Sequence, residues 1–506
     1  MTMLTRYLSS HIVGQVVVTL CNLLFLPIYI QYLGSSGYAF YGLYVVFLSW
    51  LVLLDGGLTP TIVREFGKFS SSNIVPLKLR NVFKSIEIIF FFVSLIIILL
   101  FYFLGDQIIE AWLTVDDRYK DKASLILLLV VSLSSIGLFE SLYRGALLGL
   151  QNHLKLNVVI SLGALFRSLG SVVLLVHYKL TIVEFFFWHI LITFVYVLAM
   201  KYLIFIEFSK GRKEKSIFSF ESLRSVSPFA GSMFIILLLG TALTQLDKII
   251  LGKILNMSEL GYYLFAFTCV GIIPKLASPI ISTFYPKFCE LFNLDKKQEL
   301  IDSLNDSSQL VLLFTVGLTS VLITNSYGLI LVWSGDQELS LAVSKILSIL
   351  AIGSFLNAMT WMPYYAQIAN GVTRVTILGY SISTIILIPL IFFLAQYYGS
   401  VGAAIAWPLV NIFLFLFCVN LGLKEVFPEE RKKWFINNFF KPILPITMFI
   451  LLKINFLTES LLSNFLILDI LFTFIIVSII ALYFLDRTWK FSPFLRKTKE
   501  IKNEKI

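Results

Sequence analysis

The stretch Thr241–Gly252 reads TALTQLDKIILG and places two charged residues, Asp247 and Lys248, in a segment apolar enough to lie in a lipid bilayer. A charge at the centre of a membrane helix costs about 2.5 to 3.5 kcal/mol on insertion scales, so such a residue is a candidate for a substrate site or an ion pathway. Because the two residues are adjacent, their side chains leave the helix about 100° apart. We therefore expect one to face a lumen and the other a neighbouring helix.

The rest of the chain has the composition of an integral membrane protein. It contains 506 residues, of which 58% are apolar and 14% charged, and its mean hydropathy is +0.88. Runs of about 20 apolar residues span a hydrocarbon core as helices, and such runs recur throughout the sequence. The composition therefore predicts an all-α polytopic membrane protein and excludes soluble classes.

The apolar runs between polar breaks predict about fourteen transmembrane helices. The thirteenth is the weakest, because Pro442, Pro445 and Lys453 interrupt it. The expected spans are 12–33, 38–63, 86–105, 123–149, 157–177, 181–206, 228–252, 260–284, 309–333, 339–369, 372–394, 400–423, 441–457 and 464–485.

The distribution of basic residues predicts the orientation of these spans. The net charge is +10, and with a cytoplasmic N-terminus 29 basic residues fall in inside segments against six in outside segments. Such a bias is the positive-inside pattern, so we expect both termini in the cytoplasm and no nucleic-acid partner. The inside loops could also bind anionic lipids, although topology explains them sufficiently. The six outside residues are Arg118, Lys120, Lys122, Lys179, Lys253 and Lys453.

The two halves of the chain match one another weakly. An offset of 219 places Gly42, Tyr44, Pro60, Lys68 and Phe69 on Gly261, Tyr263, Pro279, Lys287 and Phe288, and an offset of 222 places Tyr143, Gly149, Ile160 and Ser161 on Tyr365, Gly371, Ile382 and Ser383. An offset of six helices predicts two parallel, pseudo-symmetric lobes that bind substrate between them. The expected parts are an N-lobe (1–225, helices 1–6), a C-lobe (226–423, helices 7–12), helices 13 and 14 (424–485) and a basic cytoplasmic tail (486–506).

Three basic residues within spans are candidates for substrate binding. Arg167 and Lys275 lie near span centres and have no acidic residue three or four positions away, whereas Lys248 lies nearer a helix end and could extend to the interface. Cations in an apolar channel suit an anionic substrate, because guanidinium and ammonium groups form charge-assisted hydrogen bonds with phosphate. We therefore expect these three residues to form a cationic cavity.

Acidic residues within spans have two expected roles. Asp55 precedes Gly56, Gly57 and Pro60, so its carboxylate could cap a broken helix or could bind a coupling proton or cation, and the sequence leaves both open. Asp247 is a second candidate for ion coupling or gating. Glu140 and Arg144 are four residues apart on one helix, a spacing that predicts a structural ion pair.

No sequence feature predicts a cofactor, a metal or a catalytic centre. The four cysteines and four histidines have no metal-ligand spacing, no G-x-x-x-x-G-K-[ST] phosphate loop occurs, and the outside loops are short. We therefore expect a protein that is not an enzyme.

Three segments resemble the polysaccharide-biosynthesis flippases, the O-antigen or capsule repeat-unit translocases of the multidrug/oligosaccharidyl-lipid/polysaccharide exporter superfamily. They are SSHIVGQVVVTLCNLLFLPIYIQYLGSSGYAFYGLY (9–44), LLDGGLTPTIVREFGKF (53–69) and QLDKIILGKILNMSELGYYLFAF (245–267). The resemblance covers essentially the whole chain. Asp247 and Lys248 match lumenal charges of the family, in which an arginine often follows the aspartate.

The resemblance implies fourteen helices in two lobes and transfer of an undecaprenyl-diphosphate-linked oligosaccharide across a bacterial inner membrane by alternating access. It implies as partners this lipid-linked substrate, membrane lipids, a coupling proton or sodium, and a polysaccharide polymerase with its chain-length machinery. Three alternatives stay open: an ion-coupled drug exporter of the same superfamily, a membrane polysaccharide polymerase or ligase, and a structural scaffold. The short outside loops weigh against the enzyme. The fourteen expected helices with Arg167 and Lys275 weigh against the exporter, and the charges within spans weigh against the scaffold.

Overall fold

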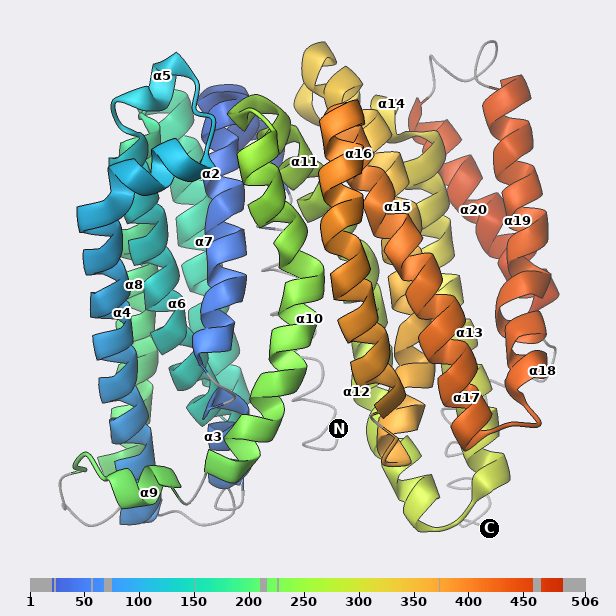
Figure 1. Cartoon of the computed structure of the whole chain (residues 1–506), viewed down its shortest axis with the longest axis horizontal. Helices are drawn as coiled ribbons and strands as arrows, with labels where there is room; N and C mark the ends of the chain where they lie inside the picture. Colours follow the sequence, from blue (N-terminus) through green and yellow to red (C-terminus); the bar gives the residue numbers. More distant parts are fainter. Residues whose placement is uncertain are drawn as a thin grey trace, which may run out of the picture. The chain divides into compact units, whose positions relative to one another are not determined.

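The computed structural model describes residues 21, 24–55, 58–67, 75–150, 152–209, 216–224, 227–372, 374–457 and 466–485. This part of the chain is helical throughout except for turns and one isolated bridge between Thr114 and Asn256 (Figure 1). It contains ten helices that are long and apolar enough to cross a membrane. The protein is therefore an all-α polytopic membrane protein. Half of the expected first span and the whole expected tail lie outside the described residues.

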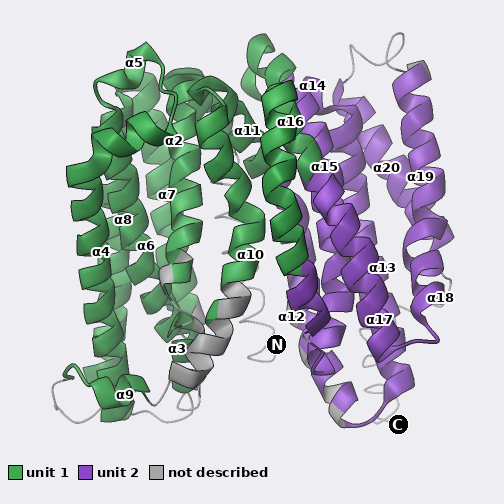
Figure 2. Ribbon diagram, in the orientation of Figure 1, with its two compact units in different colours: residues 1–269, 333–343, 380–406 green, residues 270–332, 344–379, 407–506 purple. Residues whose placement is uncertain are grey.

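The contacts divide the chain into two compact units (Figure 2). Unit 1 comprises residues 1–269, 333–343 and 380–406, and unit 2 comprises 270–332, 344–379 and 407–506. The two units are defined by contacts between residues. They do not test the expected lobe boundary at residue 225, which stays a prediction.

Unit 1 is a bundle of long helices, with α5 and α9 at its opposite ends (Figure 1). Helix α6 lies at the centre of the N-terminal part, where it contacts α2, α3, α4 and α8. The helices of this unit are α2 (Leu26–Leu54), α3 (Leu58–Gly67), α4 (Leu77–Trp112), α5 (Asp117–Lys120), α6 (Ala123–Gly149), α7 (His153–Tyr178), α8 (Ile182–Ser209), α9 (Phe220–Arg224), α10 (Ser227–Ile254) and nearly all of α11 (Met257–Val270), with parts of α15 (Gln337–Ala369) and α16 (Arg374–Leu414).

Unit 2 contains the remaining helices, three of which are π-helical segments labelled η. They are α12 (Ile272–Asn293), α13 (Lys297–Thr324), α14 (Ser326–Ser334), η1 (Phe415–Val419), α17 (Asn420–Val426), α18 (Arg431–Phe435), η2 (Ile436–Phe440), α19 (Lys441–Leu452), η3 (Lys453–Leu457) and α20 (Leu466–Phe484), with most of α15 and the ends of α16.

The expected interruption of the thirteenth span is not observed. Residues Arg431–Asn455 run as one helical stretch, in which Pro442 occupies the first turn of α19 and Pro445 lies inside it. Both prolines therefore lie inside the continuous stretch, where local π adjustments can satisfy the backbone groups that a proline frees in a membrane helix. The π-helical segments η2 and η3 flank α19 and change the local hydrogen-bond register.

The last hairpin of unit 2 is fixed to α13 by a buried charge. Lys453 donates hydrogen bonds to Asn325 at 2.9 Å and to Thr473, and it forms an ion pair with Asp469 at 2.9 Å. The prediction that Lys453 breaks this span was therefore wrong, because its charge is compensated inside the protein.

Glycine bends two of the long helices. Helix α2 changes direction at Gly34 (φ 75°, ψ 166°), and α16 does so at Gly399 (φ 59°, ψ −141°). Both glycines have a positive φ, which side chains with a Cβ rarely adopt. A further break at Asp55 separates α2 from α3.

Helix α3 packs closely against α6. A Cβ added at Gly145 would lie 2.8 Å from Thr59 Cγ2, and one added at Gly149 would lie 2.8 Å from the carbonyl oxygen of Val63. The two glycines are four residues apart and form one small-residue face, as in other closely packed membrane helices. Their spacing therefore allows the short helix α3 to lie directly on α6.

Candidate functional site

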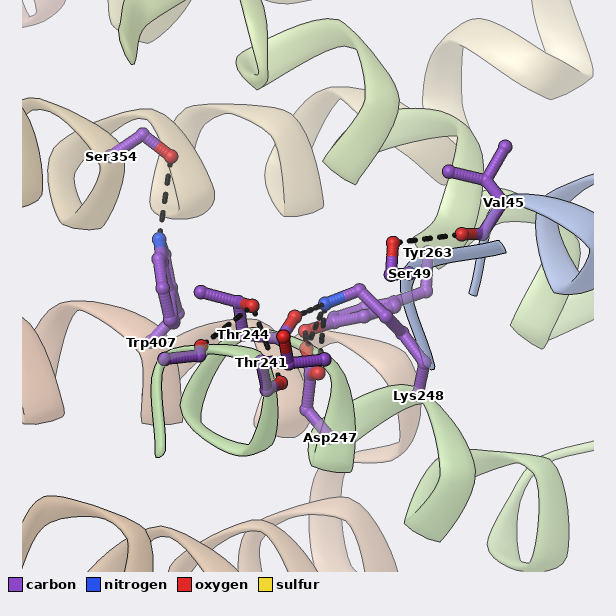
Figure 3. Close-up of polar contacts among 10 residues, drawn as sticks. Val45, Ser49, Thr241, Thr244, Asp247, Lys248, Tyr263, Ser354 and Trp407 are labelled. Atoms are coloured by element: carbon purple, nitrogen blue, oxygen red, sulfur yellow. Dashed lines mark hydrogen bonds and ion pairs between the residues drawn. The ribbon is translucent and has the colours of Figure 1, made fainter. Parts of the chain in front are cut away.

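The first element of the candidate site is a buried ion pair on α10 (Figure 3). The ammonium group of Lys248 lies 2.8 Å from Asp247 Oδ1 and also donates a hydrogen bond to the carbonyl oxygen of Thr244. Tyr263 of α11 donates a hydrogen bond of 2.7 Å to Asp247 Oδ2, and the Lys248 nitrogen lies 3.4 Å from the centre of the Phe267 ring. Lys248 is only 1% exposed, so protein groups alone compensate its charge.

One expectation for this pair was wrong, and one alternative is excluded. We expected Asp247 and Lys248 to point in different directions, but their charged groups meet on the same side of α10 (Figure 3). The four-carbon stem of lysine is long enough to return along the helix, so the 100° separation of the Cβ atoms does not separate the charges. Lys248 also does not extend to the interface, because it is buried.

The second element is a group of charged and phenolic side chains around Arg167 of α7. Its charge interacts with Glu140 of α6, Tyr44 and Tyr41 of α2, and Tyr196 of α8. Tyr196 donates a hydrogen bond of 2.5 Å to Glu140 Oε2. Polar groups of α2, α6 and α8 therefore influence the charge of one guanidinium on α7.

The expected partners of Glu140 and Arg144 differ from those in the structure. Both residues are described, and no ion pair joins them in this part of the chain. Glu140 instead accepts the hydrogen bond from Tyr196 and interacts with Arg167. Its contacts are therefore between helices rather than along one helix face.

Asp55 lies at the break between α2 and α3 and caps the start of α3. Both of its carboxylate oxygens accept a hydrogen bond from the Thr59 N–H at 3.1 Å, and Oδ1 accepts one from the Thr59 hydroxyl at 2.8 Å. Ser141 of α6 donates a hydrogen bond of 3.2 Å to the same hydroxyl. The capping role that the sequence left open is thus present, and the carboxylate is 1% exposed.

Lys275 lies on α12, which belongs to unit 2, whereas the residues described above belong to unit 1. Its side chain is exposed, and no carboxylate forms an ion pair with it among the described residues. Its role in a cationic cavity stays a prediction.

A set of polar contacts closes the α5 end of unit 1. The hydroxyls of Ser36 and Ser258 lie 2.8 Å apart, and both donate hydrogen bonds to Asp116 Oδ2. In the same region, Trp112 Nε1 donates a 2.8 Å hydrogen bond to the carbonyl oxygen of Ile249. These contacts join α2 and the α4–α5 connection to α10 and α11.

The repeat-related glycines lie at this same contact. A Cβ on Gly42 would lie 2.6 Å from Leu264 Cδ1, and a Cβ on Gly261 would lie 2.1 Å from the carbonyl oxygen of Ser35. Helices α2 and α11 therefore approach each other through the two glycines that the 219-residue offset pairs.

The aromatic partners of the buried charges were not predicted from the sequence. Tyr44 interacts with Arg167, and Tyr263 binds Asp247. The internal repeat pairs these two tyrosines, so the 219-residue offset indicated that they occupy equivalent positions in the two halves of the chain. Phe267 and Tyr196 had no such sign, because neither is among the residues that the repeat pairs.

The fold is that of solved transporters. It superposes on "Lipid II flippase MurJ, inward closed conformation" with a TM-score of 0.69 and 16% identity, over 98% of this chain and 99% of that chain. It also matches an inward-facing multidrug resistance MATE family transporter of the MOP superfamily, with a TM-score of 0.68 and 13% identity, over 84% of this chain and 99% of that chain. These matches show that the chain has the fold of the MurJ and MATE structures.

The sequence comparisons identify the family. The family described as "Polysaccharide biosynthesis protein" matches residues 4–292, more than half of the chain. A Shigella flexneri protein named "Putative O-antigen transporter" is 22% identical over 384 residues, which are 74% of this chain and 87% of that protein. The chain belongs to the polysaccharide biosynthesis protein family.

Proposed function

We propose that this transporter moves undecaprenyl-diphosphate-linked O-antigen or capsule repeat units from the cytoplasmic to the periplasmic leaflet of a bacterial inner membrane. The observation that carries the proposal is the buried ion pair of Lys248, since a cation retained at membrane depth suits an anionic substrate. The names of the Shigella relative and of the MurJ structure support the substrate class.

The proposed topology has fourteen spans, in two six-helix lobes followed by two further helices, with both termini in the cytoplasm. The kink at Gly34 would divide α2 between the first two spans, and the kink at Gly399 would divide α16 between the eleventh and twelfth. The excess of basic residues in the expected inside segments supports the orientation.

In the proposed mechanism the substrate diphosphate replaces Asp247 as the partner of Lys248. A phosphate offers more acceptor oxygens than a carboxylate, and lysine binds it as a point charge without the bidentate geometry of arginine. Arg167, held among Tyr44, Tyr196 and Glu140, would supply a second cation, and Lys275 a third. The Asp247 carboxylate, displaced from Lys248, would keep the hydrogen bond that Tyr263 donates to it.

Alternating access requires the α5 end of unit 1 to open after the substrate has bound. The Ser36–Asp116–Ser258 contacts hold this end closed in the present structure. In the proposed orientation this is the periplasmic end, so the structure would correspond to a state that receives substrate from the cytoplasm. Asp55 would act as a gating residue at the α2–α3 break, and a proton or sodium gradient would drive the cycle.

The proposal is tested by complementing a strain that lacks this gene. Arg167→Ala, Lys248→Ala and Lys275→Ala should each reduce surface polysaccharide at least tenfold and cause the lipid-linked repeat unit to accumulate on the inner leaflet. Lys120→Ala, a charge removal in an outside loop, is the matched control and should leave both quantities unchanged.

Normal polysaccharide in all three variants, at normal protein level, would contradict the anion-binding argument. A deletion strain that has normal polysaccharide but has lost drug resistance would instead favour the drug exporter. Identification of the accumulated lipid by mass spectrometry would define the sugar, and a pull-down of the polymerase would test the proposed partnership.

A further inference from the structure

Three of the six basic residues in expected outside segments line one cavity. The cavity has a volume of about 520 Å³ and lies at the α5 end of unit 1, between the bend of α2, the segment around α5 and the α7–α8 turn. Its lining includes Arg118, Lys122 and Lys179. Basic residues are depleted on the outside of membrane proteins, so their convergence at one place requires an explanation.

The cavity is a fixed part of the fold rather than a gap between mobile loops. The hydroxyl of Tyr119 in α5 donates a 2.5 Å hydrogen bond to the carbonyl oxygen of Leu33, directly before the kink at Gly34. Tyr119 is buried, and this burial raises the pKa of its phenol, so the hydroxyl keeps the proton that it donates. The α5 segment is thereby attached to α2 beside the cavity.

The three cations form no ion pair with any described carboxylate. No ion pair includes Arg118, Lys122 or Lys179 in the part of the chain that the structure describes, and Asp121 is the only carboxylate in the lining. The lining therefore has more positive than negative charge. By contrast, Lys253 donates a hydrogen bond to the carbonyl oxygen of Ala111.

Lys179 occupies a backbone conformation that usually belongs to glycine or asparagine. It follows the last turn of α7 with φ 51° and ψ 43°, in the left-handed region. This conformation costs a residue with a Cβ about 1 kcal/mol or more. Glycine at this position would remove this strain.

The surroundings of the cavity are those of a lipid interface. Helix α7 ends at Tyr178, which is 71% exposed, and α8 begins at Ile182, so two apolar spans terminate at the cavity. Tyr32 in the lining is 40% exposed, and tyrosine is enriched at the level of lipid headgroups. A ligand at this depth can place an anionic group in the cavity and apolar chains against the spans.

We propose that this cavity binds the phosphate group of an anionic lipid, held by Arg118, Lys122 and Lys179. The volume is within the range of small-molecule sites, and three cations can form charge-assisted hydrogen bonds with phosphate oxygens. The ligand has two sources with the same chemistry, namely a resident phospholipid or a polyprenyl diphosphate. In the proposed orientation the cavity opens to the periplasmic leaflet, and the binding itself does not depend on transport.

The test is native mass spectrometry of the full-length protein in detergent, with phosphatidylglycerol, undecaprenyl diphosphate or phosphatidylcholine added. We expect binding of at least one anionic lipid in preference to phosphatidylcholine. Each substitution Arg118→Gln, Lys122→Gln and Lys179→Gln should weaken that binding about fivefold, as expected for loss of one cation near a lipid phosphate. Lys120→Gln, in the same segment but outside the lining, is the control and should change it less than twofold.

Lys179→Gly separates binding from folding. It removes the charge and also the backbone strain, so its thermal unfolding midpoint should equal or exceed that of the wild type while anionic-lipid binding falls as in Lys179→Gln. Selective loss of phosphatidylglycerol or of undecaprenyl diphosphate would identify the source, and either result supports the site.

Equal binding by the wild type and the triple glutamine variant would overturn the proposal, as would equal binding of phosphatidylcholine. These measurements involve no transport, so their failure is distinct from failure of the proposed flippase function.

Discussion

Lys248 shows how a single charge is retained inside an apolar helix. Its ammonium group has an ionic partner in Asp247, a carbonyl acceptor in Thr244 and an aromatic face in Phe267. A buried ion pair is held together by such additional contacts, and removing one partner leaves an uncompensated charge. The two residues of the pair therefore depend on each other for stability.

This dependence gives a prediction for a double-mutant cycle. Asp247→Asn and Lys248→Met should each destabilise the purified protein, by about 3 to 5 kcal/mol if the remaining charge stays buried. The double variant should be more stable than the sum of the two effects, because it contains no unpaired charge. Thermal unfolding midpoints in detergent check this, and additive effects would contradict the pairing.

Asp55 gives a second prediction at the scale of the residue. Asparagine caps helices about as well as aspartate, so Asp55→Asn should retain the hydrogen bond from the Thr59 N–H, whereas Asp55→Ala should cost about 0.5 to 2 kcal/mol. Surface polysaccharide should follow the same order. Loss of gradient-dependent transport in a stable Asp55→Asn variant would instead assign the carboxylate to ion coupling.

The residues of the site were predictable only in part. Asp247, Lys248 and Arg167 stood out because each is a charge in an apolar run. The direction of the Lys248 side chain was not predictable, because the helix period fixes the Cβ and not the end of a four-carbon chain. Tyr263 and Tyr196 were missed because their contacts with Asp247 and Glu140 form between helices.

At the scale of the element, the packing of α3 on α6 depends on two glycines. Gly149→Ala would place a Cβ 2.8 Å from the carbonyl oxygen of Val63, and the backbone of α3 would have to move. We expect a loss of about 1 to 3 kcal/mol, as for other over-packed sites. Gly240→Ala in α10 is the control, since nothing lies within 4 Å of its added Cβ and alanine favours a helix.

Thermal unfolding of both alanine variants in detergent measures this difference. Equal midpoints for Gly149→Ala and Gly240→Ala would show that α3 can move away from α6 without cost.

The thirteenth span shows where local sequence rules fail. Two prolines and a lysine predicted a break, but the stretch Arg431–Asn455 is continuous. Pro442 directly follows the start of α19 after the π-helical segment η2, and such local π adjustments allow a membrane helix to contain proline. The cost of Lys453 depends on Asp469 and Asn325, which lie on other helices, so no local pattern could show its compensation.

At the scale of the whole molecule, hydropathy predicted the all-α membrane fold, because each spanning helix must satisfy its own backbone hydrogen bonds. Which helices contact one another was not predictable from hydropathy. The weak repeat pairs Gly42 with Gly261, but only the structure shows that both lie where α2 meets α11. Contacts between distant segments depend on packing that composition does not specify.

The proposed alternating-access mechanism predicts that the α5 end of unit 1 must open during transport. The Ser36 and Ser258 hydroxyls lie 2.8 Å apart, so the double variant Ser36→Cys/Ser258→Cys should form a disulfide on mild oxidation. The cross-linked protein should lose transport, and a reductant should restore it. The single cysteine variants are the controls, and full transport by the cross-linked protein would contradict opening at this end.

The closed end also bears on how much work its opening requires. Ser36 and Ser258 share one carboxylate, Asp116, through hydroxyl groups rather than through a full ion pair. Hydrogen bonds of this kind contribute only about 0.5 to 3 kcal/mol each, an amount comparable to ordinary thermal fluctuation on the microsecond to millisecond timescale. In the proposed cycle these hydrogen bonds would therefore supply only a small part of the resistance to opening, and the close approach of α2 to α11 at Gly42 and Gly261 would supply the rest.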